Sequence, residues 1–290
     1  MNASFNTIGV IGKFGNPAVN DTVRALARHL REGGKHVILD AATAETLGGE
    51  EFETGDRQRL GAECDLAIVV GGDGTLLNAA RGLVIHDVPL LGINLGRLGF
   101  LVDISPDGML ETLDEILAGH YREEHRLLLH AEVFHEGDKV SESDAFNDVV
   151  VHKWEVARMI ETETYIDGQL LSVMRSDGLI VSTPTGSTAY ALSGGGPILH
   201  PTLDAMVMVP ICPHAMSFRP YVTDGSSHIE IVVTETAHSH AQVTCDGQIN
   251  LGIVTGDRVR ISRHDKAVRL IHPMQYNFYD ILRAKLNWGG

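Results

Sequence analysis

Apolar residues in the first 120 positions follow two alternating spacings, which predict strands separated by helices. Continuous apolar runs, typical of strands buried on both faces of a parallel sheet, occupy residues 7–11, 36–40, 65–70 and 89–94. Helical spacing is found between or after these runs, at Val19, Val23, Leu26 and Leu30, and over residues 75–84 and 107–118. Repeated units of this kind indicate an α/β domain with a parallel sheet and helices on both sides.

The pattern changes near residue 120, where short strands separated by turns replace the alternation. Such strands are predicted, among other places, over residues 127–134, 146–152, 159–166, 178–182, 228–233 and 258–262. Asp-Gly pairs mark turns between several of them, so we predict a mostly β, sandwich-like second domain. We therefore expect one domain at residues 1–120, another at residues 121–271, and a tail at residues 272–290 with a final helix over roughly residues 275–286.

Composition narrows the classes of function. The chain has 290 residues, and 38 acidic against 23 basic residues give a net charge of −15. An acidic chain without a basic run argues against sequence-independent nucleic-acid binding, which depends on Lys and Arg. We expect no transmembrane helix and no signal peptide, because no apolar stretch is long enough and the first residues carry no basic leader. The isolated cysteines, Cys64, Cys212 and Cys245, fit a reducing cytoplasm better than a zinc or disulfide framework.

The apolar run at residues 65–70 leads directly into Gly71-Gly72-Asp73-Gly74-Thr75, which we interpret as a phosphate-binding turn. Ligands of open α/β sheets bind beyond the carboxyl ends of strands, and a helix N-terminus offers unpaired N–H groups to an anion. Asp73 can accept a proton or help to hold a metal ion. The alternative is a plain strand-to-helix turn with Asp73 as the N-cap.

A second region, residues 177–197, reads DGLIVSTPTGSTAYALSGGGP. A strand and a Pro-Thr-Gly turn are followed by side chains that can hydrogen-bond a ribose, an amide or phosphates, namely Ser187, Thr188, Tyr190 and Ser193. The alternative is a polar loop that closes a hairpin. So many small and hydroxyl residues cost stability without a ligand, so the whole block favours a binding site.

Together the two regions resemble the signature of the NAD kinases. The resemblance extends over nearly the whole chain and includes GINLGRLGFL at residues 92–101, FNDVV at 146–150, RSDG at 175–178, CDGQ at 245–248 and IHP at 271–273. Diacylglycerol and sphingosine kinases share the turn at residues 71–75, but not the second block. The resemblance implies an N-terminal α/β domain, a C-terminal β-sandwich domain, and a tail (residues 272–290) that packs back on the first domain.

The resemblance also implies an activity, namely transfer of the ATP γ-phosphoryl group to the 2′-hydroxyl of the adenosine ribose of NAD. Asp73 matches the general base of the family, and the phosphate loop corresponds to Gly71, Gly72, Gly74 and Thr75. The residues that match NAD-binding positions are Asp73, Gly74, Asn147, Asp148, Arg158, Arg175, Asp177, Thr188, Ala189, Tyr190, Ala191, Leu192, Ser193 and Gln248. Relatives often carry Glu where this chain has Asp148, and the position of Arg158 varies in type.

Further expectations concern partners. NAD and ATP are the expected substrates, Mg²⁺ is expected to accompany ATP without a dedicated protein metal site, and a cytoplasmic homo-oligomer, dimer or tetramer, is expected. We expect neither a nucleic-acid nor a membrane partner. The sequence leaves open whether polyphosphate replaces ATP, whether NADH is also an acceptor, whether NADPH or NADH regulates the enzyme, and whether Arg81 and Arg97 contact phosphate.

Two other functions are compatible with part of these features: a lipid kinase and a non-catalytic dinucleotide binder. A lipid kinase would need an apolar or basic surface facing the membrane, and an acidic chain without a basic amphipathic helix argues against it. A non-catalytic binder of NAD(H) or NADP(H) would keep a pocket at residues 188–193, but it would have no use for Asp73 in a Gly-rich turn.

Overall fold

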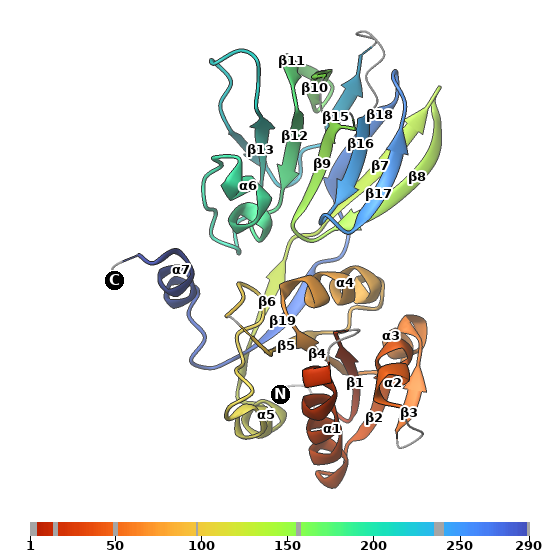
Figure 1. Cartoon of the computed structure of the whole chain (residues 1–290), viewed down its shortest axis with the longest axis vertical. Helices are drawn as coiled ribbons and strands as arrows, with labels where there is room; N and C mark the ends of the chain where they lie inside the picture. The colour runs from red at the N-terminus through yellow and green to blue at the C-terminus, as the bar shows by residue number, and fades with distance from the viewer. Residues whose placement is uncertain are drawn as a thin grey trace. The chain divides into compact units, whose positions relative to one another are not determined.

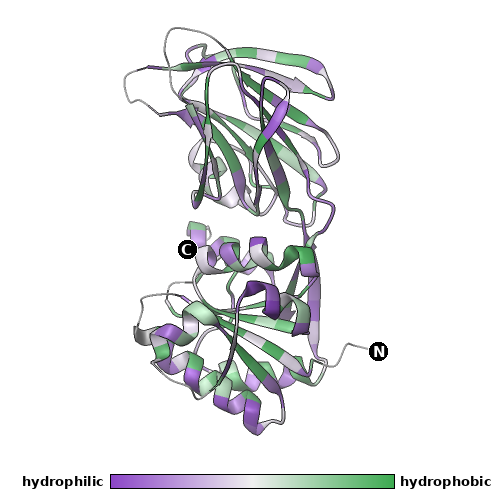
Figure 2. Cartoon of the chain, turned by 90° about the vertical axis from the view of Figure 1, so that its right-hand side faces the viewer, coloured by the Kyte–Doolittle hydropathy of each residue, from purple (hydrophilic) through white to green (hydrophobic). Residues whose placement is uncertain are grey.

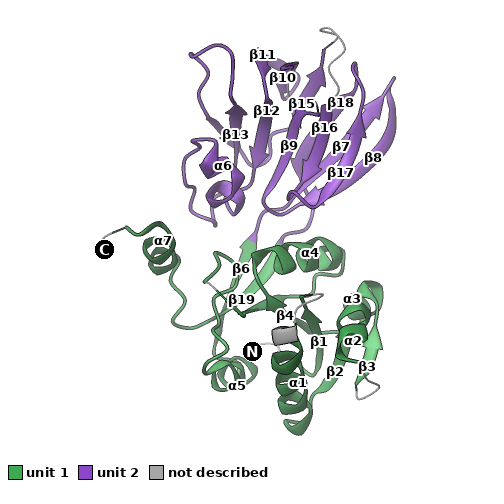
Figure 3. Cartoon of the chain, in the orientation of Figure 1, with its two compact units in different colours: residues 1–125, 268–290 green, residues 126–267 purple. Residues whose placement is uncertain are grey.

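The computed structural model describes residues 5–13, 17–48, 52–96, 98–154, 158–234 and 241–288. The chain divides into two compact units (Figure 3). Unit 1 comprises residues 1–125 and 268–290, and unit 2 comprises residues 126–267. Unit 2 is therefore inserted in the sequence of unit 1, and each unit is described by itself.

Unit 1 alternates strands and helices along most of its length (Figure 1). Its strands are β1 (Thr7–Gly12), β2 (His36–Asp40), β3 (Glu53–Gly55), β4 (Leu66–Gly71), β5 (Leu90–Asn94), β6 (Tyr121–Arg126) and β19 (Val268–Pro273). Its helices are α1 (Pro17–Glu32), α2 (Ala41–Leu47), α3 (Arg57–Glu63), α4 (Asp73–Leu83), the short 3₁₀ turn η1 (Val84–His86), α5 (Met109–Leu117) and α7 (Phe278–Leu286).

The strands of unit 1 form one seven-stranded sheet in the order β3-β2-β1-β4-β5-β19-β6. The pairs β2–β3, β1–β2, β1–β4, β4–β5 and β5–β19 are all parallel. All six residues of β4 are buried, because Ile68 and Val70 pack with α1 and α5 while the alternate side chains face the other layer. Green, hydrophobic strands between helices of mixed colour show the same layering in Figure 2. The chain runs from β1 through β2 to β3 on one side of β1 and then crosses to β4 on its other side, so the sheet has a topological switch point between β1 and β4.

Unit 2 is almost entirely β structure. Its strands are β7 (Leu129–His135), β8 (Asp138–Ala145), β9 (Asp148–Lys153), β10 (Ile160–Ile166), β11 (Gln169–Ser176), β12 (Gly178–Ser182), β13 (Ala205–Ile211), β14 (Tyr221–Asp224), β15 (Ile229–Val233), β16 (Ala241–Cys245), β17 (Ile249–Ile253) and β18 (Arg258–Arg263). Two short helical turns, η2 (Gly186–Thr188) and α6 (Tyr190–Ser193), follow β12.

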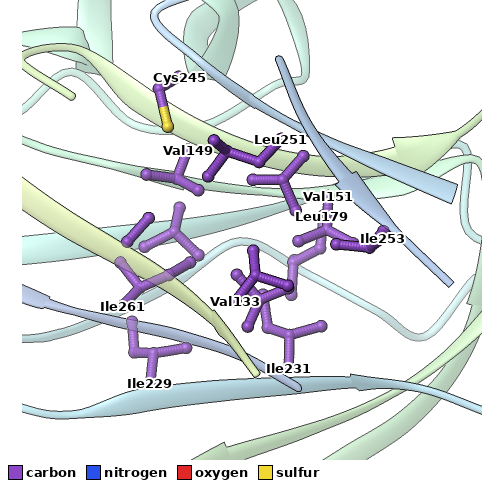
Figure 4. Packing of buried hydrophobic residues seen from close by; sticks show 14 of the residues in the cluster. Val133, Val149, Val151, Leu179, Ile229, Ile231, Cys245, Leu251, Ile253 and Ile261 are labelled. Carbon is purple, nitrogen blue, oxygen red and sulfur yellow. The ribbon is translucent and has the colours of Figure 1, made fainter. Parts of the chain in front are cut away.

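These strands form two antiparallel sheets, β11-β10-β15-β18-β7-β8 and β14-β13-β12-β9-β16-β17. Alternate residues of most of these strands point inward, and side chains from both sheets, such as Val133 and Ile231 from one and Val151 and Leu251 from the other, form one core (Figure 4). The predicted fold class is confirmed: an α/β unit with a parallel sheet and a second unit of antiparallel β sheets. Within the described ranges, no helix is long and apolar enough to cross a bilayer.

Candidate functional site

The Gly-rich turn lies at the switch point of the unit 1 sheet. Gly71 ends β4, Gly72 is the N-cap residue of α4, and Asp73 is the first residue of that helix. The backbone N–H of Thr75 donates to the carbonyl of Gly72 at 2.9 Å, so the first turn of α4 begins at once. The N–H groups of this first turn and the positive end of the α4 dipole face the position beyond β4 where ligands of open α/β sheets bind.

The Asp73 carboxylate is held by three consecutive backbone N–H groups. Phe100 donates to Oδ2 at 2.8 Å, while Leu101 and Val102 donate to Oδ1 at 3.1 and 3.3 Å. A carboxylate accepts about four hydrogen bonds, two at each oxygen. Among the described contacts, Asp73 therefore has one acceptor position left, on Oδ2. It does not act as a side-chain N-cap, because the cap of α4 has no side-chain hydrogen bond.

Gly99 makes this contact possible. A Cβ atom built on Gly99 would lie 2.1 Å from Asp73 Oδ1 and 2.7 Å from a methyl group of Val102. Only glycine lets the segment approach the carboxylate this closely. The string containing Gly99 contributed to the resemblance, but its link to Asp73 was not predicted, because the two residues are 26 positions apart and belong to different elements.

Cations near the turn differ from those considered in the sequence. Lys13 follows β1 directly, its N–H donates to Val70 at 2.9 Å, and its Cβ lies 3.3 Å from the position of a Cβ on Gly71. Arg81 is in the last turn of α4, eight residues beyond Asp73, which is about 12 Å along the helix. Arg97 lies outside the described residues. Among the described residues considered, Lys13 is therefore the cation that the fold brings beside the turn, and no pattern in the sequence indicates it.

A second aspartate in unit 2 binds backbone in the same way. The carboxylate of Asp246 accepts hydrogen bonds from the N–H groups of Phe146 at 3.0 Å, Asn147 at 2.6 Å and Asp148 at 3.2 Å. The backbone carbonyl of Asn147 accepts from the N–H of Thr183 at 2.9 Å. These bonds fix the backbone of Asn147 and do not involve its half-buried side-chain amide, which can still bind a ligand.

Asp148 lies at the start of β9 and is only 4% exposed. Burial, and secondarily the negative charge of Asp246, raise the pKa of its carboxyl to about 7. Near neutral pH this side chain is therefore partly protonated, so it can donate as well as accept a hydrogen bond.

The segment after β12 packs directly on Asn147. A Cβ atom on Gly186 would lie 2.1 Å from the Asn147 carbonyl oxygen. Ser187, one of the hydroxyls that we predicted could meet a ligand, is fully buried; it donates to Pro184 and accepts from the N–H of Leu199 at 2.9 Å. That prediction is wrong for Ser187, whose hydroxyl holds the loop together.

The next residues, 188–193, vary in exposure. Thr188 is half-buried and donates to the Thr185 carbonyl at 3.3 Å, and Ala189 is also half-buried. Tyr190 and Ser193 are exposed, Leu192 is intermediate, and Ala191 is buried in a small core cluster. Tyr190 and Ser193 therefore present the most accessible polar side chains of the segment.

The remaining predicted site residues fall into two groups. Gln248 follows the Asp246 turn, where its N–H donates to Cys245 at 3.0 Å, so it lies with Asn147 and Asp148. Asp177 forms a 2.7 Å ion pair with Lys153 at the far end of β9, five residues or about 17 Å from Asp148.

Arg175 and Arg158 belong to the second group. Arg175 is exposed near the end of β11, two residues before Asp177, and Arg158 is exposed two residues before β10. Ile160 and Ser176 are paired, so β10 begins where β11 ends. The structure therefore brings Asn147, Asp148 and Gln248 together, and the Asp177 group is separate from them.

One other cluster has the composition of a metal site. His130, Glu132 and Glu142 lie on the outer face of β7 and β8, with potential ligand atoms within 4.8 Å of one another. The ammonium of Lys139 is 3.2 Å from Glu132 and 2.5 Å from Glu142. These carboxylates already have a cation, so we do not assign a metal to them.

Comparison with known proteins covers both units. Residues 8–121 match the ATP-NAD kinase N-terminal domain family, and residues 146–273 match the ATP-NAD kinase C-terminal domain family. NAD kinases of Pseudomonas entomophila (strain L48) and Pseudomonas syringae pv. tomato (strain ATCC BAA-871 / DC3000) are each 52% identical to this chain over 285 residues. Those alignments cover 98% of this chain and 96% of each relative.

Two solved structures are similar over nearly the whole chain. Yeast NADH kinase in complex with NADH has a TM-score of 0.89 at 25% identity, covering 99% of this chain and 89% of that one. An NAD kinase from Archaeoglobus fulgidus in complex with ATP has a TM-score of 0.76 at 25% identity, covering 98% and 100%.

Proposed function

The chain belongs to the NAD kinase family of enzymes, and from that premise we propose that it transfers the γ-phosphoryl group of ATP to the 2′-hydroxyl of the adenosine ribose of NAD, with Asp73 as the general base. The observation that carries the proposal is the single acceptor position left on Asp73 Oδ2. Three N–H groups fix the carboxylate, so its remaining lone pair has one direction in which to take a proton.

The proposed phosphoryl transfer needs no reactant other than ATP and NAD. The ribose oxygen forms a bond to the γ-phosphorus while the bond from that phosphorus to the β–γ bridging oxygen breaks, and ADP leaves with the electron pair. Asp73 accepts the hydroxyl proton as the new bond forms. Because phosphoryl transfer has a loose transition state, alignment and charge neutralisation supply most of the acceleration.

We assign the triphosphate of ATP to the N-terminus of α4, at the switch point of the unit 1 sheet. The Gly-rich turn at residues 71–75 supplies the proposed phosphate donors, except for the Thr75 N–H, which donates to Gly72; Lys13 is the proposed cation of the protein. Mg²⁺, when bound with ATP, would neutralise part of the phosphate charge. The donor set fits this ion, since Mg²⁺ keeps several waters and needs few protein oxygens. Asn94, which ends β5 beside Gly71, is buried, and its amide oxygen accepts from the Gly96 N–H at 3.1 Å, so only its second lone pair could meet that shell.

We assign the adenosine of NAD to Asn147, Asp148, Gln248 and residues 188–193. The support is that Asp246 and Gly186 fix the backbone of Asn147 and leave its amide available. Arg158, Arg175 and Asp177 stand about 17 Å away along β9. We propose that they serve the dinucleotide from a second copy of the chain, which makes the enzyme a homo-oligomer. Three cysteines as thiols favour a reducing, cytoplasmic location.

The test is Asp73→Asn, which keeps the shape of the side chain and removes its basicity. The rate of NADP formation should fall at least about 10²-fold, the lower end for general acid–base catalysis, with NAD binding by calorimetry unchanged. Asp56→Asn, at the N-cap of α3, is a matched control and should keep full activity. Full activity of Asp73→Asn would overturn the assignment.

The same assay decides substrate range. NAD and NADH should each be tested against ATP and polyphosphate, since a similar solved structure is an NADH kinase with NADH bound. NADPH formation at a rate comparable to NADP formation would add NADH to the acceptors.

A further inference from the structure

The segment that holds Asp73 has little regular structure of its own. Residues 98–103 are neither helix nor strand, although Phe100, Leu101 and Val102 direct consecutive N–H groups at the Asp73 carboxylate. Beyond them, a bridge between Ile104 and Ile93 ties the segment to β5. Residue 103 lies between these N–H groups and the bridge, so the contacts of residue 103 bear on where the N–H groups point.

Asp103 is fixed by a histidine from the end of the chain. His272, in β19, has its Nδ1 3.0 Å from Asp103 Oδ2, and the two side chains are 2% and 9% exposed. Within the described residues, Asp103 Oδ1 and His272 Nε2 are both buried without a hydrogen-bond partner. Among the described residues, each side chain is thus the other's only side-chain hydrogen-bond partner, so losing one leaves the other buried and unsatisfied.

Two further contacts join the same C-terminal segment to this region. The ring of Tyr276 stacks on His272 with centroids 3.8 Å apart, which fixes the plane of the imidazole. The ammonium of Lys285, in α7, lies 5.3 Å from the centroid of the Phe100 ring. Residues 268–286 therefore contact the segment at Asp103, which follows the three N–H donors to Asp73, and at Phe100, which is the first of those donors.

We propose that His272 is a positioning residue, which holds Asp103 so that residues 100–102 aim the Asp73 carboxylate. The inference rests on the proposed role of Asp73 as the base. If Nδ1 no longer meets Asp103, that carboxylate is buried without a donor, and the segment moves to let it reach water. The N–H groups attached to the next residues move with it, and Asp73 loses its fixed direction.

The side-chain geometry supplies a test that separates positioning from space filling. In His272→Asn the amide nitrogen occupies nearly the place of Nδ1, whereas in His272→Gln it reaches toward the place of Nε2. Gln is closer to His in volume. Positioning predicts that the Asn variant keeps kcat within about threefold of the parent and that the Gln variant loses about tenfold or more, with KM for NAD and ATP little changed. The reverse order would overturn the proposal.

A double-mutant cycle shows whether the effect passes through Asp73. His272→Leu should lower kcat at least about tenfold in the parent but hardly further in an Asp73→Asn background, since no base remains to be aimed. His29→Leu removes another His–Asp pair of unit 1, to Asp114 at 2.7 Å, and should leave kcat unchanged. Equal losses in both backgrounds would overturn the proposal. Full activity of Asp73→Asn alone would refute the base assignment instead, so the two failures are distinguishable. If His272→Leu does not fold, the kcat values of the His272→Asn and His272→Gln variants still test the proposal.

Discussion

Gly99→Ala is the sharpest probe of the contact between residues 99–102 and Asp73. The added Cβ would lie 2.1 Å from Asp73 Oδ1, whereas real Cβ atoms essentially never come within 3.0 Å of another heavy atom. Either the carboxylate or the segment must therefore move by about 0.9 Å. Because the N–H···O distances already span 2.8 to 3.3 Å, a shift of that size breaks at least one of them.

The magnitude follows from this displacement. A misplacement of about 1 Å at a reacting group can cost about 10²-fold in rate, and a hydrogen bond to a charged group contributes about 1.5–3 kcal/mol. We therefore expect kcat for NADP formation to fall about 10²-fold, while the KM values for ATP and NAD change by less than about threefold. Steady-state rates at varied NAD and ATP give both quantities.

The matched control is Gly82→Ala, in the same helix as Asp73. Its Cβ would meet Arg57 atoms at 3.7–4.0 Å, which are ordinary contacts, and alanine suits a helix better than glycine. This variant should keep the parent's kcat and unfold at the same temperature or slightly higher. If Gly99→Ala also keeps the parent's kcat while remaining folded, then the position of the Asp73 carboxylate does not limit the rate, and the reasoning fails.

Two further predictions concern unit 2. Because the folded pKa of Asp148 is raised to about 7 from an ordinary value near 4, the folded state holds a proton that the unfolded chain releases between about pH 4 and 7. The contribution of this proton to the free energy of unfolding is therefore lost as pH rises through that window, by at most about 4 kcal/mol. The urea midpoint of the parent should fall between pH 5 and 8, and Asp148→Asn should remove this pH dependence. Parallel curves of midpoint against pH for the two proteins would contradict the prediction. Gly186→Ala would place a Cβ 2.1 Å from the Asn147 carbonyl oxygen, so NAD affinity by calorimetry should fall at least about tenfold, and unchanged affinity would exclude Asn147 from the site.

Much of unit 1 could be predicted because each buried strand carries its own pattern. The run at residues 36–40 coincides with β2, and the run at 65–70 is offset from β4 by one residue. The mixed charges of residues 122–126 are typical of a solvated segment, yet these residues lie in β6, and Arg126 is only 2% exposed. Its burial depends on contacts such as the one to Thr185, 59 residues away, which no local pattern reports.

Some residues of the candidate site could likewise be predicted from the sequence, and others could not. Asp73 could be identified from its turn, and Asn147 from the resemblance of its string to a family. Asp246 was noticed only as part of a turn, although its carboxylate organises the backbone at Asn147. The pair of Asp103 and His272 is separated by 169 positions, so neither residue is notable until the fold brings them together. Sequence patterns reveal residues whose role depends on their own local motif. They miss residues that position another residue through a contact made only in the folded structure.

The place of β19 in the sheet has a consequence for how the protein is made. β5 has its parallel partner β19 on one side, but the 142 residues of unit 2 are synthesised before β19. At about 5–20 residues per second, a ribosome needs between about 7 and 28 s for that stretch. During this interval one edge of β5, whose five residues are all buried in the finished fold, has unpaired backbone N–H and C=O groups that can pair with another strand. Mispairing of β5 is therefore a risk while unit 2 emerges, and the segment at residues 98–103 can meet His272 only after unit 2 has been synthesised.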